Sequence, residues 1–165
     1  MPVISQFLQE LEHETRTTRR VLERVPADRL DWKPNPKSSS LGQLAFHVAA
    51  IPGRLSALAV KGGMETAGRP PQPAPESKEQ ILERVDASLA EAKAALGTLD
   101  DAALADTWTI TRGGQQLLAM PRGNMLRTFI MSHLIHHRGQ LTVYLRLLDV
   151  PLPTVYGPTA DEMIA

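Results

Sequence analysis

The sequence predicts an all-α fold, a four-helix bundle, from three observations. Four long segments place apolar residues at i, i+3 and i+4 spacing, which is the pattern of an amphipathic helix. Stretches rich in proline and glycine separate these segments. The chain has 165 residues, enough for one domain with a substantial core, so we expect residues 1–165 to form a single domain.

The composition limits the kinds of binding partner and the cellular compartment that we expect for this protein. The 18 basic and 18 acidic residues cancel, so charge gives no reason to expect nucleic acid or an anionic membrane as partner. No apolar run approaches about 18 residues, and the N-terminus lacks the pattern of a secretory signal. Cysteine is absent, which excludes disulfides, a protein thiol nucleophile and thiolate metal ligands. We therefore expect a cytoplasmic protein with no membrane span.

The first two predicted helices have clear boundaries. The first covers residues 3–24 and ends at Val25-Pro26, after which residues 26–40 form a proline-rich loop. The second begins near Ser40, where Ser40-Leu41-Gly42-Gln43 fits a capping box. Pro52 lies inside the apolar pattern of this helix, so a kink or a gap in its hydrogen bonding is expected.

The second half of the chain contains the other two helices and a short extended segment. Residues 62–76 are rich in glycine and proline and predict a loop or linker. A second capping box, Ser77-Lys78-Glu79-Gln80, is expected to open the third helix, which runs to about Leu96. Residues 106–120 place β-favouring runs around a Gly-Gly pair, which predicts a small hairpin or an extended loop. The fourth helix then covers about residues 122–148.

Three of the five histidines lie in the fourth predicted helix, and they do not share one face. At about 100° per residue, His133 and His137 fall on the apolar stripe and His136 falls off it. Two histidines at i, i+4 spacing can ligate one divalent metal ion. His47, at the border of the apolar face of the second helix, is the candidate third ligand, whereas we expect His13 to be exposed. The alternative is that these histidines are core residues held by hydrogen bonds.

Other residues carry weaker signals. Gly139 inside the fourth helix predicts either a close helix–helix contact, which we favour, or space for a ligand beside a metal. Arg138 and Gln140 are expected to pack or to form interhelix hydrogen bonds. Trp32 and Trp108 are expected to anchor loops, with pocket walls as the alternative. The following carboxylates are interpreted as solvated and not as catalytic pairs: Glu10, Glu12, Glu14, Glu79 and Glu83.

Several short motifs occur together in this chain. They are Trp32-Lys33-Pro34, then Ser40-Leu41-Gly42-Gln43-Leu44 leading to His47, then His133-x-x-x-His137-Arg138-Gly139-Gln140-Leu141, then Val150-Pro151, and Tyr156-Gly157-Pro158-Thr159 before Asp161. In this combination the chain resembles the DinB-like (DNA-damage-inducible, YfiT-like) metalloprotein superfamily. The resemblance spans nearly the whole chain, and the histidine motif is its most specific part.

The resemblance implies a four-helix bundle of the DinB/YfiT-like type with one divalent metal ion held by His47, His133 and His137. It also implies a homodimer. Related proteins include S-transferases and isomerases that use low-molecular-weight thiols, and the fold does not select among these reactions. Nitrogen ligands suit zinc or nickel, and three of them leave a coordination position open for water or substrate.

We therefore expect a divalent-metal-binding protein, a metal-dependent enzyme of hydrolase or low-molecular-weight-thiol S-transferase type acting on a small molecule. A thiol would have to arrive with the substrate, because the chain has none. Two alternatives remain. One is a non-catalytic metal-binding stress-response or interaction protein, and the other is a plain helical bundle whose histidines are structural. No catalytic residue is identified from the sequence.

Overall fold

The computed structural model describes residues 1–68, 70–71 and 73–163, so parts of the predicted 62–76 linker and of the C-terminal end lie outside the described residues. Within them, three long helices are α1 (Val3–Leu22), α2 (Leu41–Lys61) and α3 (Lys78–Leu96). The fourth long helix comprises α4 (Arg122–Met125), a π-helical stretch (Leu126–Ser132) and α5 (His133–Leu147). Short 3₁₀ turns cover Ala27–Arg29 and Ala102–Ala105. The four predicted helices are thus confirmed.

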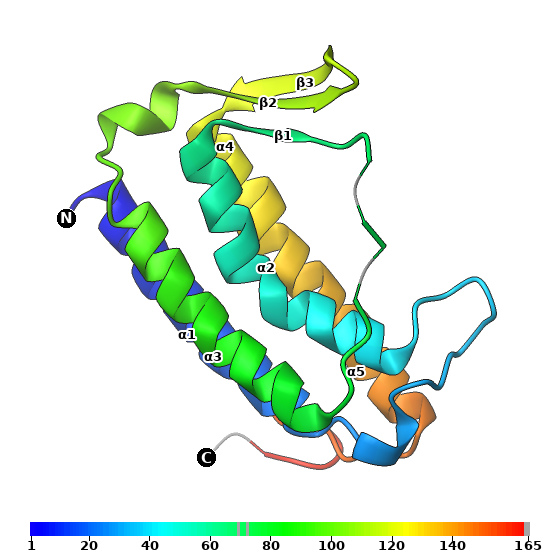
Figure 1. Cartoon of the computed structure of the whole chain (residues 1–165). Coiled ribbons are helices and arrows are strands. Elements are labelled where there is room, and N and C mark those ends of the chain that lie inside the picture. Colours follow the sequence, from blue (N-terminus) through cyan, green and yellow to red (C-terminus); the bar gives the residue numbers. More distant parts are fainter. Residues whose placement is uncertain (69, 72, 164–165) are drawn as a thin grey trace.

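The fold also contains a sheet, so the predicted all-α class is too narrow. Strands β2 (Thr107–Arg112) and β3 (Gln115–Pro121) are antiparallel and joined at Gly113 and Gly114, whose φ angles of 58° and 80° suit a tight hairpin turn. Strand β1 (Gly63–Glu65) pairs in parallel with β2 and was not expected. Its three residues are too few to show strand periodicity. The sheet lies across one end of the helices (Figure 1).

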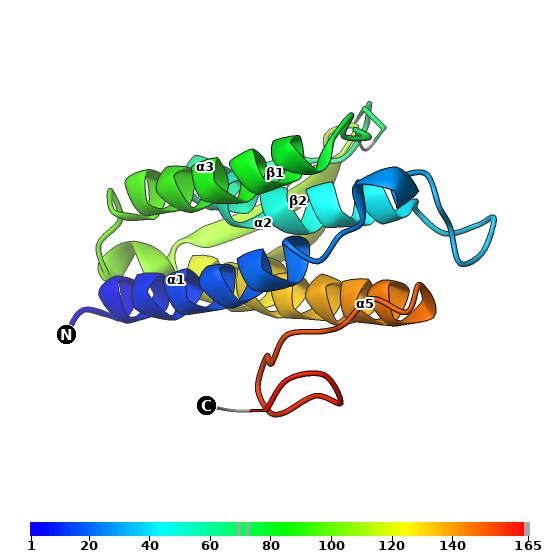
Figure 2. The same cartoon turned by 90° about the horizontal axis from the view of Figure 1, so that it is seen from below.

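The long helices pack side by side around one apolar core (Figures 1 and 2). α2 contacts α3 and α5, and α1 contacts the same two helices from the other side. Core residues come from every long helix, among them Leu11, Val48, Val85 and Leu141, all at most 1% exposed. The packing places α2 beside α5. The sequence did not predict that these two helices are neighbours.

The capping box and the proline of α2 behave as the sequence predicts. The Ser40 side chain accepts a hydrogen bond from the Gln43 amide, and the Gln43 side chain accepts one from the Ser40 amide. α2 continues through Pro52, but the amide of Gly53 donates to Ser88 Oγ of α3, at 2.7 Å. A side chain of α3 therefore takes part in the hydrogen bonding that proline disturbs in α2.

α2 is also long and apolar enough to cross a membrane by length and composition alone, with a mean hydropathy of 1.2 over 18 residues. In the structure 56% of that window is buried inside the protein. A buried core helix passes the same test, so this helix by itself is weak evidence for a membrane span.

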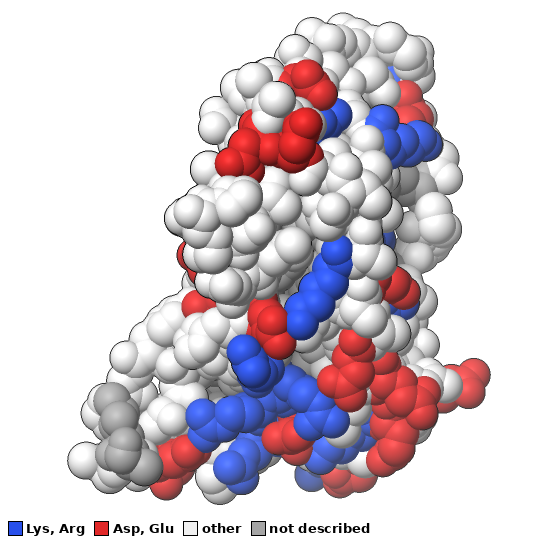
Figure 3. Space-filling model, turned by 90° about the vertical axis from the view of Figure 1, so that its left-hand side faces the viewer, with Lys and Arg blue, Asp and Glu red and all other residues white. Residues whose placement is uncertain are grey.

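The face in Figure 3 carries neighbouring acidic and basic side chains, particularly in its lower part. Among the ion pairs on α1 and α3, Arg19 pairs with Glu23 and Asp86, and Lys93 lies 2.8 Å from Glu12. Charge of both signs is therefore interleaved on α1 and α3, in line with the zero net charge of the chain.

Candidate metal centre

Three histidines from α2 and α5 face one another between these two helices. The Nε2 atoms of His47 and His133 are 3.2 Å apart, and one ring nitrogen from each of His47, His133 and His137 lies within 4.8 Å of the others. Their ring centroids are 4.5 to 5.1 Å apart. All three side chains are half-buried. The structure thus brings together the three histidines that the sequence analysis selected.

The other two histidines lie where the helical wheels predict. His13 and His136 are exposed. The His136 ring is 4.9 Å from the His137 ring, but its nitrogens are not part of the cluster of converging ring nitrogens. The i, i+4 spacing therefore separates a facing pair from an outward neighbour on the same helix.

The helical wheel, however, predicted that His133 and His137 are more deeply buried than they are. The fully buried side of α5 carries Leu134, Leu141 and Leu145, and the histidines flank it on the side of α2. Two helices, α1 and α2, cover α5, so its core face is centred away from the pair. The π-helical stretch before His133 adds to the error, because its i→i+5 turns shift the phase that a regular wheel carries forward from Leu126.

Hydrogen bonds fix two of the three imidazole rings. The Nδ1 atom of His137 lies 2.6 Å from Oε1 of Gln140, and the His133 ring bonds the backbone of Phe129 in the π-helical stretch. These contacts orient the remaining ring nitrogens toward the space between the helices.

Burial keeps the three imidazoles neutral near pH 7. It lowers the pKa of His47 to about 4, helped by the neighbouring His137 and His133 rings and the charge of Arg54. Burial likewise lowers the pKa of His133 to about 4. Burial also lowers the pKa of His137, while its bond to Gln140 acts in the opposite direction. A neutral imidazole has a lone pair to offer, which is the form that binds a cation.

A pocket of about 460 Å³, the histidine pocket, opens beside the cluster. The three histidines form one wall, and the others are Gln140 and Tyr144 of α5, Leu44 of α2, and Ser38 and Ser39 of the preceding loop. The Tyr144 hydroxyl lies 3.4 Å from the Ser39 carbonyl oxygen. Gln140 was expected to pack or to form interhelix hydrogen bonds, but it is exposed and bonds His137 on its own helix, for which the i, i+3 spacing was a usable signal.

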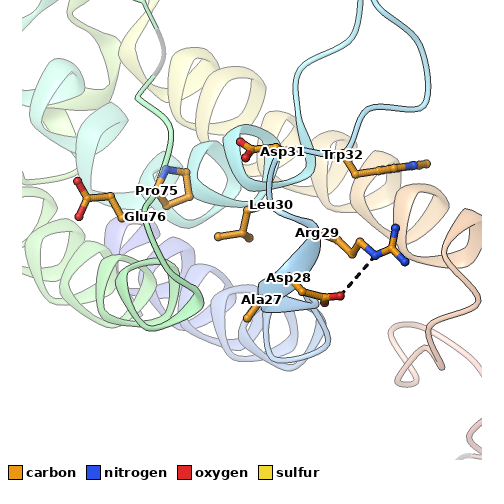
Figure 4. A pocket seen from close by; sticks show the side chains of 8 residues that line it. All are labelled: Ala27, Asp28, Arg29, Leu30, Asp31, Trp32, Pro75 and Glu76. Atoms are coloured by element: carbon orange, nitrogen blue, oxygen red, sulfur yellow. Dashed lines mark ion pairs between the residues drawn. The ribbon is translucent and has the colours of Figure 1, made fainter.

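A larger pocket of about 580 Å³, the Trp32 pocket, lies near the start of α2 and is shown in Figure 4. Its lining includes Trp32, Leu30 and the ion-paired Asp28 and Arg29, 3.5 Å apart, but no histidine. The Trp32 ring packs edge-on against Tyr144, which lines the histidine pocket. Trp32 packs against the core, as expected of a loop anchor, and it also lines a pocket. Trp108 is an anchor: it is fully buried and donates to the Leu58 carbonyl at 2.9 Å.

A buried ion pair next to the histidines corrects the expectation for Glu14 and confirms the one for Arg138. Glu14 of α1, which we expected to be solvated, lies 2.8 Å from Arg138 of α5, and their side chains are only 9% and 2% exposed. The hydroxyl of Tyr156 bonds both side chains, at 2.6 Å from Arg138 and 2.9 Å from Glu14. Arg138 makes the interhelix contacts expected of it, and the pair fixes the rotation of α5 against α1.

The glycine expected at a close helix contact is a different one. A Cβ atom at Gly139 would meet nothing within 4 Å, so this glycine is not at a helix crossing. At Gly53 of α2, a Cβ atom would lie 3.0 Å from the Ser88 carbonyl oxygen of α3 and would collide with Glu91. The close approach of helices is therefore between α2 and α3.

Comparisons with known proteins agree with this fold. The DinB family model matches residues 1–164. The uncharacterized protein YrdA of Bacillus subtilis is 29% identical over 163 residues, which cover 96% of this chain and 91% of that protein.

Two solved structures are similar over most of their length. A DinB-like protein from Bacillus cereus has a TM-score of 0.66 at 29% identity, covering 91% of this chain and 95% of its own. The DinB-like protein YjoA from Bacillus subtilis has a TM-score of 0.66 at 17% identity, covering 96% of this chain and 99% of its own. At that identity the second likeness concerns the fold alone.

Proposed function

Since this chain belongs to the DinB family, we propose that it is a divalent-metal-binding protein whose ligands are His47, His133 and His137. The observation that carries the proposal is the convergence of three ring nitrogens within 4.8 Å, from two helices that are far apart in the sequence. Uncharged imidazoles at neutral pH and rings held by Gln140 and Phe129 support it.

The donor set fits a metal ion such as zinc or nickel. Zinc–nitrogen bonds of about 2.0–2.1 Å in a tetrahedral site place ligand nitrogens roughly 3.3 Å apart. His47 and His133 already have their Nε2 atoms at 3.2 Å, where two lone pairs would repel unless a proton or a cation lies between them.

We further propose that the protein is a metal-dependent enzyme, of hydrolase or low-molecular-weight-thiol S-transferase type. The support is the histidine pocket of about 460 Å³, which gives a small substrate direct access to the three histidines. When bound, a divalent metal supplies Lewis-acid chemistry that lowers the pKa of water or of a thiol. Gln140 orients His137, and Tyr144 lies beside the pair where it can contact a substrate.

One observation favours the alternative, a non-catalytic metal-binding stress-response or interaction protein. The residues that line the histidine pocket include no carboxylate, so that wall offers no strong general base. A thiol substrate would need none, because the proton of a metal-activated thiol can pass to solvent.

Metal analysis of untagged protein tests the site. We expect about one zinc or nickel ion per chain, a lower Tm after chelator treatment, and loss of metal from His137→Ala and from the triple variant His47→Ala/His133→Ala/His137→Ala. His136→Ala is the matched control and should keep its metal. Stoichiometric metal in the triple variant would refute the ligand set. No metal and no chelator effect in the unmodified protein would favour a structural role for the histidines.

Assays with the metal-loaded protein then test the reaction. For the transferase, a small thiol is offered monochlorobimane: the sulfur–carbon bond forms, chloride leaves with the bonding electrons, and the thiol proton passes to solvent. Acceleration by the protein that is absent from His137→Ala supports catalysis. No acceleration here or with ester and amide substrates favours the non-catalytic alternative. Sedimentation of the purified chain tests the homodimer that the family resemblance implies.

A further inference from the structure

A second pocket adjoins the candidate metal centre, between α2 and α3. This Phe46 pocket has a volume of about 370 Å³, within the range of about 300–1,000 Å³ that is usual for small-molecule sites. Its lining includes Phe46, His47, Ala50 and Arg54 of α2 and Arg84 and Glu91 of α3. His47 also lines the histidine pocket, so the two pockets adjoin at a candidate metal ligand.

The apolar part of the Phe46 pocket comes from α2 and from the segment before α3. Phe46 and Ala50 lie one helical turn apart and therefore share a face of α2, and Pro73 adds further apolar surface. Phe46 is half-buried and packs against the core, which fixes its position in the pocket wall. Ala50 contributes only a methyl group, so a longer side chain at this position would occupy part of the pocket.

The charged residues of the Phe46 pocket have partners within the protein. Arg84 and Glu91 form an ion pair with each other, and Arg54 takes part in an interaction within the protein as well. A charged ligand would therefore have to leave water without gaining an unpaired group of opposite charge, which is unfavourable. An uncharged apolar group avoids this cost and gains from burial. The lining thus favours an uncharged apolar ligand.

The histidine pocket has a different character. Ser38, Ser39, Gln140 and Tyr144 give it hydroxyl and amide groups, which suit a substrate that forms hydrogen bonds. The proposed S-transferase reaction needs two substrates, a polar thiol and an electrophile, to meet at one point. Two pockets of unlike polarity that adjoin at His47 provide such an arrangement.

We infer that the Phe46 pocket is the subsite for the uncharged apolar body of the electrophile, while the thiol lies in the histidine pocket. The electrophilic carbon then lies at the His47 end of the subsite. The sulfur–carbon bond forms at this carbon, the leaving group departs with the bonding electrons, and the thiol proton passes to solvent. The inference rests on the proposed function for the reaction, but the subsite itself requires only residues of this chain. It narrows the second substrate to neutral apolar compounds with a leaving group.

Binding of benzyl alcohol to the chelator-treated protein, measured by NMR, tests the subsite without the metal. We expect saturable binding that shifts the amide signals of residues 46–50, and weaker binding of benzoate and of benzylamine, the charged analogues. Ala50→Leu should bind at least about tenfold more weakly, because a loss of about 55 Å² of apolar contact already costs that factor. Phe46→Ala removes part of the wall and should also weaken binding.

Ala57→Leu is the matched control for Ala50→Leu. It adds the same side chain at an exposed position of the same helix and should bind benzyl alcohol as the unmodified protein does. Circular dichroism of each variant establishes that it is folded. The inference is overturned by any of three results: no saturable binding of benzyl alcohol, equal affinity for the charged analogues, or a loss in Ala50→Leu no larger than in Ala57→Leu.

Kinetics of the metal-loaded protein test which substrate the Phe46 pocket takes. With cysteine as the thiol and monochlorobimane as the neutral electrophile, Ala50→Leu should raise the KM for monochlorobimane and leave the KM for cysteine unchanged. A rise in the KM for cysteine instead would contradict the assignment. If the unmodified protein accelerates no transfer, the proposed reaction is refuted, whereas the metal-free binding experiment decides the subsite separately.

Discussion

The Nδ1 atom of His137 lies 2.6 Å from Oε1 of Gln140, three residues further along the same helix. Because Oε1 can only accept a hydrogen bond, the contact selects the tautomer with the proton on Nδ1, and Nε2 keeps the lone pair that a cation would bind. Gln140 thereby sets the orientation of one candidate ligand through a bond within its own helix.

Replacing Gln140 by Leu should therefore weaken metal binding without abolishing it. Loss of a hydrogen bond that orients a ligating histidine costs about 10–100-fold in metal affinity. Competition with a chromophoric chelator measures the affinity, and Gln116→Leu on exposed β3 is the control. Unchanged affinity in Gln140→Leu would mean that the bond does not orient the ring for metal binding.

The free energy of unfolding of the metal-free protein should decrease as the pH is lowered through a defined window. Burial lowers the pKa of His47 and His133 to about 4, while the unfolded chain has the ordinary value near 6.5. Between these values the unfolded state binds more protons, so stability is fully present above about pH 6.5 and is lost progressively toward pH 4. Metal affinity should decline in the same direction, because protonated imidazole is no ligand.

Thermal unfolding after chelator treatment, scanned from about pH 7 to pH 5, measures this dependence. The double variant His47→Gln/His133→Gln should show a flatter profile, whereas His13→Gln, at an exposed position, should follow the unmodified protein. Parallel profiles for the double variant and the unmodified protein would assign the pH dependence to other groups.

The buried ion pair should be costly to break from one side. Arg138→Met leaves Glu14 buried without its partner, and we expect a loss of about 3–5 kcal/mol in the free energy of unfolding. Adding Glu14→Leu removes the uncompensated charge and should recover much of that loss. Urea denaturation measures each value. Arg16→Gln disrupts an exposed pair with Glu12 and should cost less than about 1 kcal/mol; a similar cost for Arg138→Met would show that the buried pair is not structural.

The two helical glycines should respond in opposite ways to alanine. Gly139→Ala should raise the free energy of unfolding by up to about 1 kcal/mol, because alanine is the better helix former and nothing lies within 4 Å. Gly53→Ala should lower it, since the new methyl group would press on the Ser88 carbonyl. Chemical denaturation compares the two, and stabilisation by Gly53→Ala would contradict the tight α2–α3 contact.

Much of the local structure could be predicted from the sequence because its signals are local. The capping box at Ser40, the Gly113-Gly114 turn and the i, i+3, i+4 pattern of α1 each depend on residues a few positions apart. Strand β1 could not, because three residues hold too little periodicity and the strand exists only where β2 pairs with it.

The candidate site likewise has features that local sequence predicts and features that it does not. Helical spacing alone separated His133 and His137 from His136, and the border position of His47 was visible on its own helix. How deeply the pair lies was misjudged, since the burial of an α5 residue depends on which helices cover it. Glu14 was interpreted as solvated because nothing near it in the sequence indicates that Arg138, 124 residues away, reaches its backbone and side chain.

The sequence by itself therefore determined which side chains have metal-binding chemistry and on which side of each helix they project. The tertiary structure decided that α2 lies against α5, which brings His47 to His133 across 86 residues, and that residues of α2 and α3 line a second pocket shared with His47. The physical reason is that periodicity fixes direction within one helix, whereas the choice of neighbouring helix depends on the packing of the whole core.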